Sequence, residues 1–232
     1  MINGFYSAKS GVKSFQTSLD ITANNIANVN TQGYKAQSAS FTDLLYTDAQ
    51  GADFLVGNGS RLATTSLQAE QGGLGQDGQR SVAIIGEGFF AIEIGQNETA
   101  YTRSGNFSLS VEGNANYLTL PGGEYVLGQN GQRIQVQDGN VMEAISQAAL
   151  YTFPRAEELE AMGENMYVQT EASGAAALDN ASQLEFSAYE LSNVDLVSEM
   201  NKMMLAQRGM QFNMRMLQTA DELEQEVNNL RR

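Results

Sequence analysis

The side chains of this chain that are able to do chemistry are few in kind. The sequence has no histidine and no cysteine, which removes histidine triads, thiolate nucleophiles, disulfides and nearly every zinc or haem site. Catalysis would need a carboxylate pair, a Ser-Lys dyad or a metal held by oxygen ligands. The composition therefore predicts a protein that is not an enzyme and that holds no cofactor or metal.

Glu157, Glu158 and Glu160 form an acidic cluster of the kind from which a catalytic pair is built. They follow Pro154, which suits the first position of a short helix that we expect to end before Gly163. Acidic side chains in a first helical turn are stabilised by the helix dipole. An exposed acidic turn is therefore the preferred interpretation.

Glycines, methionines and one acidic turn are further candidates for phosphate or metal binding. The glycine groups at 72–75 and 86–88 lack the phosphate-loop lysine and the complete GxGxxG spacing, so they predict turns. Asp138-Gly139-Asn140 lacks the further ligands of a calcium loop. Six of the ten methionines lie between Met200 and Met216 at helical spacing, which favours packing over soft-metal binding.

Two apolar patterns with a seven-residue repeat lie at the two ends of the chain. The first, the N-terminal seam, comprises Phe5, Ala8, Val12, Phe15, Leu19, Thr22 and Ile26. The second, the C-terminal seam, has one gap at Gln207 and comprises Leu196, Met200, Met203, Met210, Met214 and Leu217. This spacing predicts two helices with one apolar stripe each. We expect each stripe to dock on the other or on a neighbouring copy of the chain.

Polar residues crowd the end of the first predicted helix: Asn24, Asn25, Asn28 and Asn30, followed by Gly33 and Tyr34. Asparagine is a poor residue inside a helix because its amide competes for backbone hydrogen bonds. Two interpretations stay open, a fraying helix end with turn formers or a hydrogen-bonding patch between subunits. Both end the helix near Asn28–Thr31.

The pattern along the chain predicts an α+β fold that is mainly β. Residues 1–35 together with 190–232 form a coiled-coil-like helical axial domain, whose second helix begins at Asn193 with Ser192 or Asn193 as its cap. Residues 36–75 read as an extended connector with a possible helical turn around Phe41–Tyr46. Residues 76–189 carry short β-type runs separated by turn residues, which predicts an inserted antiparallel barrel or sandwich, with a hairpin turn at Asn130-Gly131.

The net charge of −14 is unevenly distributed. Residues 1–35 carry +2, residues 193–232 carry −1, and the middle carries −15. The sequence has no large cluster of basic residues of the kind that binds nucleic-acid phosphates. We expect no secretory leader, because Lys9 and Lys13 interrupt the first apolar residues, and no membrane insertion.

A polar stripe accompanies the C-terminal seam, on the opposite side of the same predicted helix. Its members recur every seven residues: Asn201, Arg208, Arg215, Glu222 and Asn229. Such a stripe is usually exposed to solvent, and in a tubular assembly it would line a wet lumen.

Several stretches resemble the bacterial flagellar rod and hook family. LDITANNIANVNTQGYK (residues 19–35) is similar to its N-terminal signature, with Gln32 where the family commonly has proline. Further similar blocks follow in order: GEGFFAI (86–92), YTRSGNFSL (101–109), YVLGQNGQ (125–132), FPRAEELEAMGENMYVQTEASG (153–174) and ELSNVDLVSEM (190–200). Collinear blocks over almost the whole chain make this resemblance specific.

The resemblance implies a structural axial subunit of the flagellar basal body, which crosses the cell envelope. Such subunits are exported without a cleaved signal peptide, and they assemble helically into a hollow rod that transmits torque from motor to hook. The implied partners are further copies of the chain, other rod and hook proteins, the export apparatus and ring or bushing proteins. Residues 57–74 resemble the distal-rod type and MRMLQTADE (214–222) the proximal type, and we favour the distal type.

Three alternatives belong to other classes. A flagellar enzyme that cuts the cell wall would use Glu87 or Glu112 as its acid. A hook or hook-associated protein would share the axial helices but usually carries larger insertions. A secreted adhesin would use the helices as a coiled-coil stalk.

Overall fold

The computed structural model describes residues 2–48, 55–76, 81–95, 98–113, 115–137 and 140–230. The chain forms two compact units. The helical unit contains Met1–Ala27, Gln37–Ser66 and Asp195–Arg232, and the β-rich unit contains Asn28–Ala36 and Leu67–Val194. Most of the expected connector therefore belongs with the terminal helices. The turn at Asp138-Gly139 lies outside the described residues.

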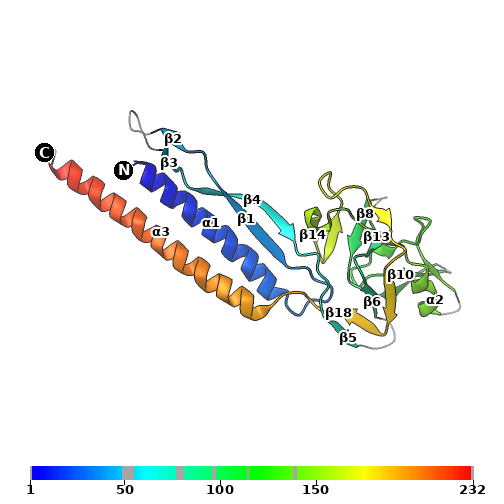
Figure 1. Cartoon of the computed structure of the whole chain (residues 1–232). Helices are drawn as coiled ribbons and strands as arrows, with labels where there is room; N and C mark the ends of the chain where they lie inside the picture. Colours follow the sequence, from blue (N-terminus) through cyan, green and yellow to red (C-terminus); the bar gives the residue numbers. More distant parts are fainter. Residues whose placement is uncertain are drawn as a thin grey trace. The chain divides into compact units, whose positions relative to one another are not determined.

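Two long helices build the helical unit, α1 (Ile2–Ala27) and α3 (Leu196–Leu230), and they lie side by side in opposite directions (Figure 1). Neither contains proline, and α1 ends directly before Asn28, as the asparagine pattern predicted. The cap of α3 is Asp195, whose Oδ1 accepts a hydrogen bond from the Val197 N–H over 3.0 Å. The expectation of a cap at Ser192 or Asn193 was wrong.

A β ribbon follows α1 within the same unit. It pairs β1 (Gln37–Asp43) with β4 (Ser60–Leu67), and β2 (Thr47–Asp48) pairs antiparallel with β3 (Leu55–Val56) (Figure 1). The helical turn expected around Phe41–Tyr46 was wrong, because β1 is a strand through Asp43. Its partner strand β4 is distant in the sequence, so a local pattern did not reveal the pairing.

The β-rich unit is organised around one antiparallel sheet. In the described chain its strands run in the order β12-β10-β11-β7-β8-β15-β14, with β9 on β10, β13 on β7 and β16 on β13. The bounds are β7 (Phe89–Ile94), β8 (Glu98–Thr102), β9 (Ser108–Glu112), β10 (Ala115–Thr119), β11 (Tyr125–Val126), β12 (Gln135–Val136), β13 (Leu150–Thr152), β14 (Glu160–Gly163), β15 (Met166–Val168) and β16 (Ala177–Leu178).

Smaller elements complete this unit. Two strand pairs stand beside the main sheet, β5 (Leu74–Gln76) with β18 (Ala188–Glu190) and β6 (Val82–Ile85) with β17 (Gln183–Phe186). The short helix expected after Pro154 is a single 3-10 turn, η1 (Ala156–Glu158), and the chain then continues as a strand. The helix α2 (Val141–Ser146) was not predicted.

Of the barrel or sandwich that the sequence predicts, a closed barrel is not confirmed, because the described strands follow an open path. The reason lies in β7. One edge of β7 pairs with β8 along its length, and its other edge is divided between two short strands, β13 and β11. There, Phe89 and Phe90 pair with β13, and Ile92 and Glu93 pair with β11. Because these partner strands are only two or three residues long, the sheet branches instead of closing.

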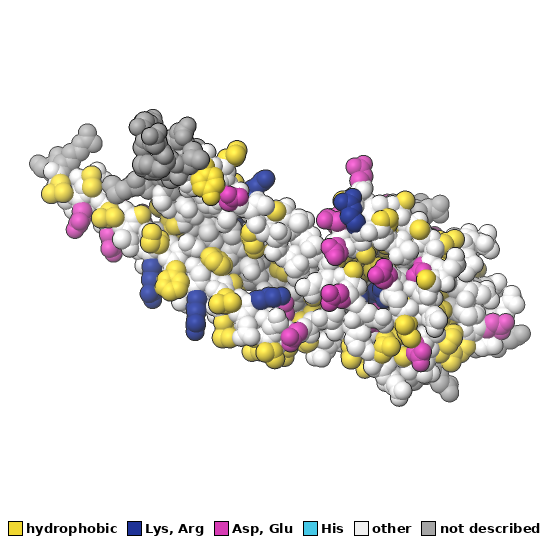
Figure 2. Space-filling view, in the orientation of Figure 1, with side chains coloured by type: hydrophobic (Ala, Val, Ile, Leu, Met, Phe, Trp, Pro, Cys, Tyr) yellow, Lys and Arg dark blue, Asp and Glu magenta, His cyan; other side chains and the backbone are white. Residues whose placement is uncertain are grey.

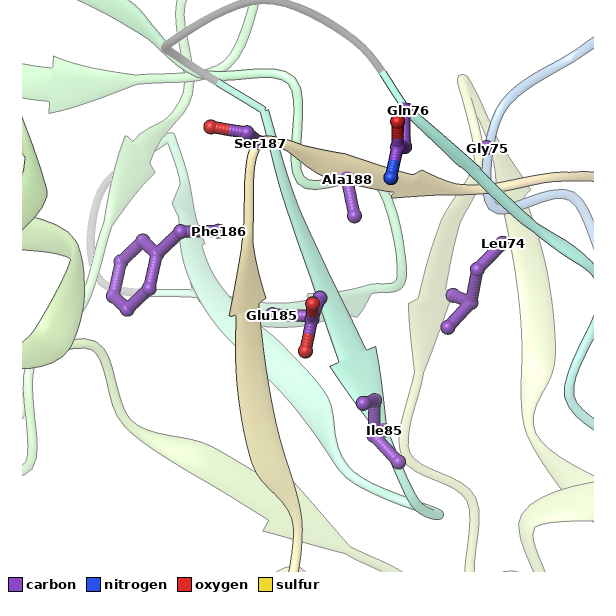
Figure 3. Close-up of a pocket in the computed structure, with 8 residues that line it drawn as sticks. All are labelled: Leu74, Gly75, Gln76, Ile85, Glu185, Phe186, Ser187 and Ala188. Carbon is purple, nitrogen blue, oxygen red and sulfur yellow. The ribbon is translucent and has the colours of Figure 1, made fainter.

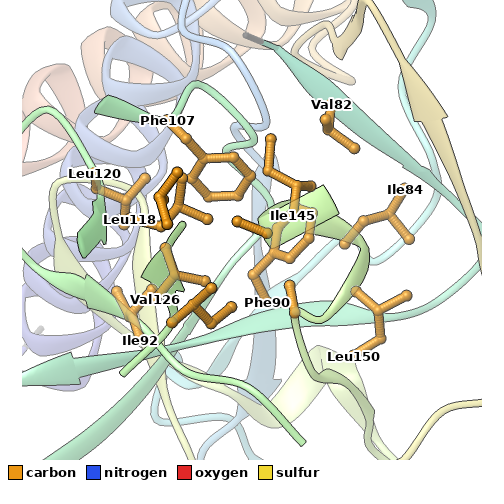
Figure 4. Close-up of a cluster of buried hydrophobic side chains, with 14 of the residues drawn as sticks. Val82, Ile84, Phe90, Ile92, Phe107, Leu118, Leu120, Val126, Ile145 and Leu150 are labelled. Atoms are coloured by element: carbon orange, nitrogen blue, oxygen red, sulfur yellow. The ribbon is translucent and has the colours of Figure 1, made fainter. Parts of the chain in front are cut away.

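The core of the β-rich unit consists of apolar side chains from several strands and from α2 (Figure 4). Phe90 and Phe107 meet edge to face with ring centroids 5.1 Å apart, and Ile145 of α2 is fully buried among them. A second cluster contains Phe89, Tyr101 and further aromatic side chains. Aromatic contacts of this kind stabilise a fold beyond the area that they bury.

The hairpin turn predicted at Asn130-Gly131 is confirmed. Leu127 and Arg133 form an antiparallel bridge around it, and Gly131 has a φ of +69°, which glycine adopts without strain. No helix in the described part of the chain is both long enough and apolar enough to cross a bilayer.

Candidate assembly interface

Three contacts fix how α1 and α3 lie against each other. They join Gly11 to Asn213, Phe15 to Gly209, and Asn25 to Glu199. From the first contact to the second, the residue number rises by four on α1 and falls by four on α3. From the second to the third, both helices change by ten. The two helices are therefore antiparallel in one continuous register.

Two glycines allow this close approach. A Cβ atom at Gly11 would lie 2.7 Å from Nδ2 of Asn213, and a Cβ at Gly209 would overlap the ring of Phe15. Glycine costs roughly 1 kcal/mol relative to alanine inside a helix. In the structure this cost is offset because the Phe15 ring packs directly on the α3 backbone.

The buried side chains of the two helices are small or polar. Among the described residues of α1 and α3 they are Ala8, Thr22, Asn25, Glu199 and Ala206. We expect the two apolar stripes to dock on each other or on a neighbouring copy, and within the chain Ala8 and Thr22 are the only members of the two stripes that are buried. The contact between α1 and α3 depends instead on short side chains and on hydrogen bonds.

Asn25 joins three segments of the helical unit. Its Nδ2 donates to the carbonyl oxygen of Gln37 over 2.8 Å and to Oε2 of Glu199 over 3.1 Å, and its Oδ1 accepts from the Gln37 N–H over 2.9 Å. Asn25 is almost completely buried. A buried polar group of this kind fixes the register of paired helices, because every other register leaves it without partners.

Glu199 completes this polar clamp, which comprises Asn25, Gln37, Glu199 and Lys202. The Glu199 side chain is buried, and its Oε1 accepts a hydrogen bond from Nζ of Lys202 over 2.6 Å, while Lys202 itself is half exposed. The ammonium group supplies the opposite charge that a buried carboxylate needs. The clamp therefore lies at the end of the helical unit where α1 finishes and α3 begins.

Serines attach the β ribbon to the other side of α1. The Ser60 N–H donates to Oγ of Ser10 over 3.2 Å, and the hydroxyls of Ser14 and Ser60 lie 3.1 Å apart. The preceding Gly59 has a φ of +102° and faces Ser10 directly. Small side chains thus also mediate this contact, so α1 lies between α3 and the ribbon.

The residues of the N-terminal seam lie at different depths. Ala8 and Thr22 are buried and Phe15 packs on Gly209, whereas Val12, Leu19 and Ile26 are half buried and Phe5 is exposed. Towards α3, the positions one residue earlier, Gly11 and Asn25, make the contacts. The predicted repeat thus coincides with the α1–α3 contact at Phe15 and is displaced from it by one residue at Val12 and Ile26.

The C-terminal seam is displaced in the same way. Met203, Met210 and Leu217 are half buried, whereas Leu196, Met200 and Met214 are exposed. The positions one residue before the exposed methionines, Glu199 and Asn213, contact α1. The polar stripe of Asn201, Arg208, Arg215, Glu222 and Asn229 is exposed throughout.

The polar residues around the end of α1 divide into buried and exposed ones. Asn24 and Asn30 are exposed, and Asn28 accepts a hydrogen bond from the Thr31 hydroxyl over 3.1 Å. Gly33 is buried with a φ of +67°, and its N–H donates to the Glu190 carbonyl over 2.8 Å. Tyr34 is half buried, and its carbonyl accepts from the Asn193 N–H over 3.4 Å.

A buried ion cluster in the β-rich unit was missed by the sequence analysis. Nζ of Lys35 lies 2.7 Å from Oε1 of Glu190, and NH1 of Arg103 lies 3.3 Å from Oε2 of the same carboxylate. The three side chains are almost fully buried. The sequence contains one indication of this cluster, because each of the three charged residues lies inside one of the blocks that carry the family resemblance.

Further groups surround this ion cluster, which comprises Lys35, Arg103 and Glu190. Lys35 Nζ also donates to the Glu70 carbonyl over 2.7 Å, and the Arg103 guanidinium lies over the Phe89 ring, 4.8 Å from its centroid. Nε of Arg103 has no hydrogen-bond partner in the described chain. Burial lowers the pKa of Lys35 and of Arg103, and Glu190 opposes this in both. The cluster joins segments far apart in the sequence.

A hollow beside the strand pairs β5–β18 and β6–β17 offers no catalytic arrangement. Glu185 is its only ionisable group among the described lining residues, beside apolar Leu74 and Ile85, while Phe186 projects from the opposite side of β17 (Figure 3). A single carboxylate supplies neither a catalytic pair nor a metal site. Glu87 and Glu112, the acids considered for a wall-cutting enzyme, are both exposed on the surface and lie outside this hollow.

Comparison with family models gives three matches along the chain. Residues 5–35 match the flagella basal body rod protein model, residues 83–148 match the D1 domain of the flagellar hook protein FlgE/F/G, and residues 187–230 match the C-terminal model of the flagellar basal body rod FlgEFG proteins. The first and last matches cover most of α1 and all of α3.

Two curated rod proteins match over nearly their whole length. The chain is 34% identical to the flagellar basal-body rod protein FlgG of Bacillus subtilis, with 100% of both chains covered. It is 33% identical to FlgG of Caulobacter vibrioides, with 97% of both covered. A match to the flagellar hook protein FlgE of Helicobacter mustelae, at 33% identity, covers 60% of this chain and 34% of that protein.

Proposed function

Because the chain belongs to the family of flagellar basal-body rod proteins, we propose that it is a structural subunit of the flagellar rod. The observation that carries this proposal is the match over the whole chain to proteins named FlgG, the distal rod protein. The match to a hook protein covers only about a third of that protein. A distal-rod subunit is therefore favoured over a hook subunit.

The proposed mechanism is helical self-assembly through the terminal helices. Support comes from the large apolar side chains that the α1–α3 contact leaves exposed, among them Leu196, Met200 and Met214. In an assembly of many copies these side chains would be buried against neighbouring helices, which is favourable in proportion to the apolar area removed from water. The monomer would thus keep its packing surface available.

A drive shaft that transmits torque from motor to hook must resist twisting. Interdigitated helices do so because packed side chains cannot slide past one another without opening voids. We propose that the helical unit supplies this packing in a hollow tube and that the β-rich unit forms its outer part. The proposed location is the basal body, with other rod and hook proteins, the export apparatus and ring or bushing proteins as partners.

Removal of the gene tests the proposed function. A strain of the source bacterium that lacks the chain should assemble no hook and should not swim. The parent chain should restore both, and normal swimming without it would overturn the proposed function.

The variant Met200→Asp/Met214→Asp should fail to restore swimming. Both side chains are exposed, so the purified monomer should keep its helical content and its thermal unfolding. Gln211→Asp, another exposed position on α3, is the control and should restore swimming. Full motility of the methionine variant would contradict a role for these side chains in assembly.

A further inference from the structure

The C-terminal end of α3 extends past the end of α1. In the register of the helical unit, Gly11 lies against Asn213, so Ile2, the first residue of α1, is level with Glu222. The remaining residues of α3, up to Leu230, have no part of α1 beside them. We call residues 221–230 the α3 overhang, which joins these residues to the last two, Asp221 and Glu222, that are level with the start of α1.

The overhang carries an apolar stripe beside a concentration of negative charge. Leu223, Val227 and Leu230 follow the helical spacing of four and three, and their exposed fractions are 46%, 49% and 87%. The four charged residues of the overhang are all acidic: Asp221, Glu222, Glu224 and Glu226. None of them forms an ion pair with a lysine or arginine of the described chain.

The N-terminal half of α1 carries the complementary pattern. Phe5 and Tyr6 are 37% and 59% exposed, and Lys9 and Lys13 are exposed beside them without an ion pair to a described carboxylate. No acidic residue precedes Asp20 in the sequence. We call these four side chains the α1 basic face.

The two surfaces do not satisfy each other within one chain. In the observed register Lys9 is level with Arg215 of α3, which is also a cation. Figure 2 shows carboxylates towards the C-terminal end of α3, followed by cationic side chains further along the helical unit. Within the residues that the structure describes, neither the acidic overhang nor the basic face forms an ion pair with an opposite charge.

We propose that the overhang of one copy docks on the α1 basic face of a second copy. The inference rests on the proposed function, that the chain assembles with itself, and it names the surfaces that meet. Burial of Leu223, Val227 and Leu230 against Phe5 and Tyr6 supplies the apolar part of the contact, and the acidic and lysine side chains align it. Two different surfaces of the same chain form a heterologous contact, which repeats into an open helical filament.

Charge reversal tests the contact. In the full chain, Lys9→Glu/Lys13→Glu and, separately, Glu222→Lys/Glu226→Lys should each raise the concentration needed for assembly about tenfold at low salt, because like charges would then face each other. The chain that carries all four reversals should need a concentration within about threefold of that of the parent, because the opposite charges face each other again with exchanged signs. Glu98→Lys/Glu185→Lys, at two exposed positions of the β-rich unit, controls for net charge and should assemble like the parent.

Cross-linking provides a readout that does not depend on charge. The chain has no cysteine, so Tyr6→Cys and Leu223→Cys each introduce a single thiol. Filaments made from a mixture of these two variants should yield a covalent pair of two different chains with a short bismaleimide. A mixture of Tyr6→Cys with Val111→Cys, an exposed position of the β-rich unit, should not.

The outcomes separate the two proposals. If the parent chain forms no filament under any condition tested, the proposed self-assembly itself fails. If the parent assembles but the charge reversals leave its assembly unchanged, or the fourfold reversal does not recover it, or the two cysteines do not cross-link, the contact between the overhang and the basic face is overturned.

Discussion

Asn25 on α1 donates a hydrogen bond to Glu199 on α3 over 3.1 Å, across 174 positions of sequence. The same amide also makes two hydrogen bonds to the backbone of Gln37. One buried side chain therefore ties the end of the first helix, the start of the last helix and the first strand of the ribbon together. A polar clamp at this point sets the register of the helical unit before any second copy is present.

Asn25→Ala should lower the free energy of unfolding of the helical unit by about 2–4 kcal/mol, because it removes three buried hydrogen bonds and leaves Glu199 and Gln37 short of a partner. Urea unfolding followed by far-UV circular dichroism measures this. Asn201→Ala, an exposed asparagine on α3, should change the value by less than about 0.5 kcal/mol. Equal stability of the two variants would show that the clamp does not hold the helices.

Gly209→Val should destabilise the helix pair by about 1–3 kcal/mol, since its side chain has no space beside the Phe15 ring. Combination with Phe15→Ala should recover part of the loss, because the smaller side chain vacates that space. Gly4→Ala is the matched control, as a Cβ there meets nothing within 4 Å. Thermal unfolding of the parent, Gly209→Val, Phe15→Ala and the double variant gives the coupling energy, and a coupling near zero would contradict the observed contact.

Glu190→Gln should destabilise the β-rich unit by about 3–5 kcal/mol, because Lys35 and Arg103 would remain buried without an opposite charge. The change is measured by unfolding followed through tyrosine fluorescence. Glu185→Gln, an exposed glutamate on β17, should stay within about 0.5 kcal/mol of the parent. A small effect at Glu190 would mean that the cluster contributes little to stability.

The buried phenol of Tyr167 should make the free energy of unfolding fall at alkaline pH. Burial raises the pKa of its phenol well above the ordinary value, so the unfolded chain releases this proton at a pH where the folded chain retains it. The contribution of Tyr167 is therefore complete below about pH 10 and is lost as the pH rises further, by about 1.4 kcal/mol per pH unit.

Tyr167→Phe removes this dependence, together with hydrogen bonds to the Lys35 N–H and the Asn165 side chain. The parent should exceed the variant in stability at about pH 8, and the difference should shrink or reverse at about pH 11. Tyr6→Phe, which removes an exposed phenol, should follow the parent at both pH values. A constant difference between parent and Tyr167→Phe would refute the raised pKa.

Much of the architecture follows from the sequence alone. Apolar repeats identified the two terminal helices, and the asparagines after Ile26 identified the end of α1. Turn residues identified the hairpin at Gly131, and collinear blocks identified the family. These features are local, because a helix, a turn or a short motif is encoded by neighbouring residues.

The tertiary structure decided which face of each helix is buried within the chain. The seven-residue pattern marks the large apolar side chains, of which Phe15 contacts α3. The other residues at the α1–α3 contact, such as Gly11, Gly209 and the Asn25–Glu199 pair, lie outside the pattern and act through small size or through a partner distant in sequence. Backbones approach closely where side chains are short, and hydrogen bonds form where a distant group is brought near. Periodicity contains neither kind of information, and the same reason explains why the ion pair between Lys35 and Glu190 emerged only from the folded chain.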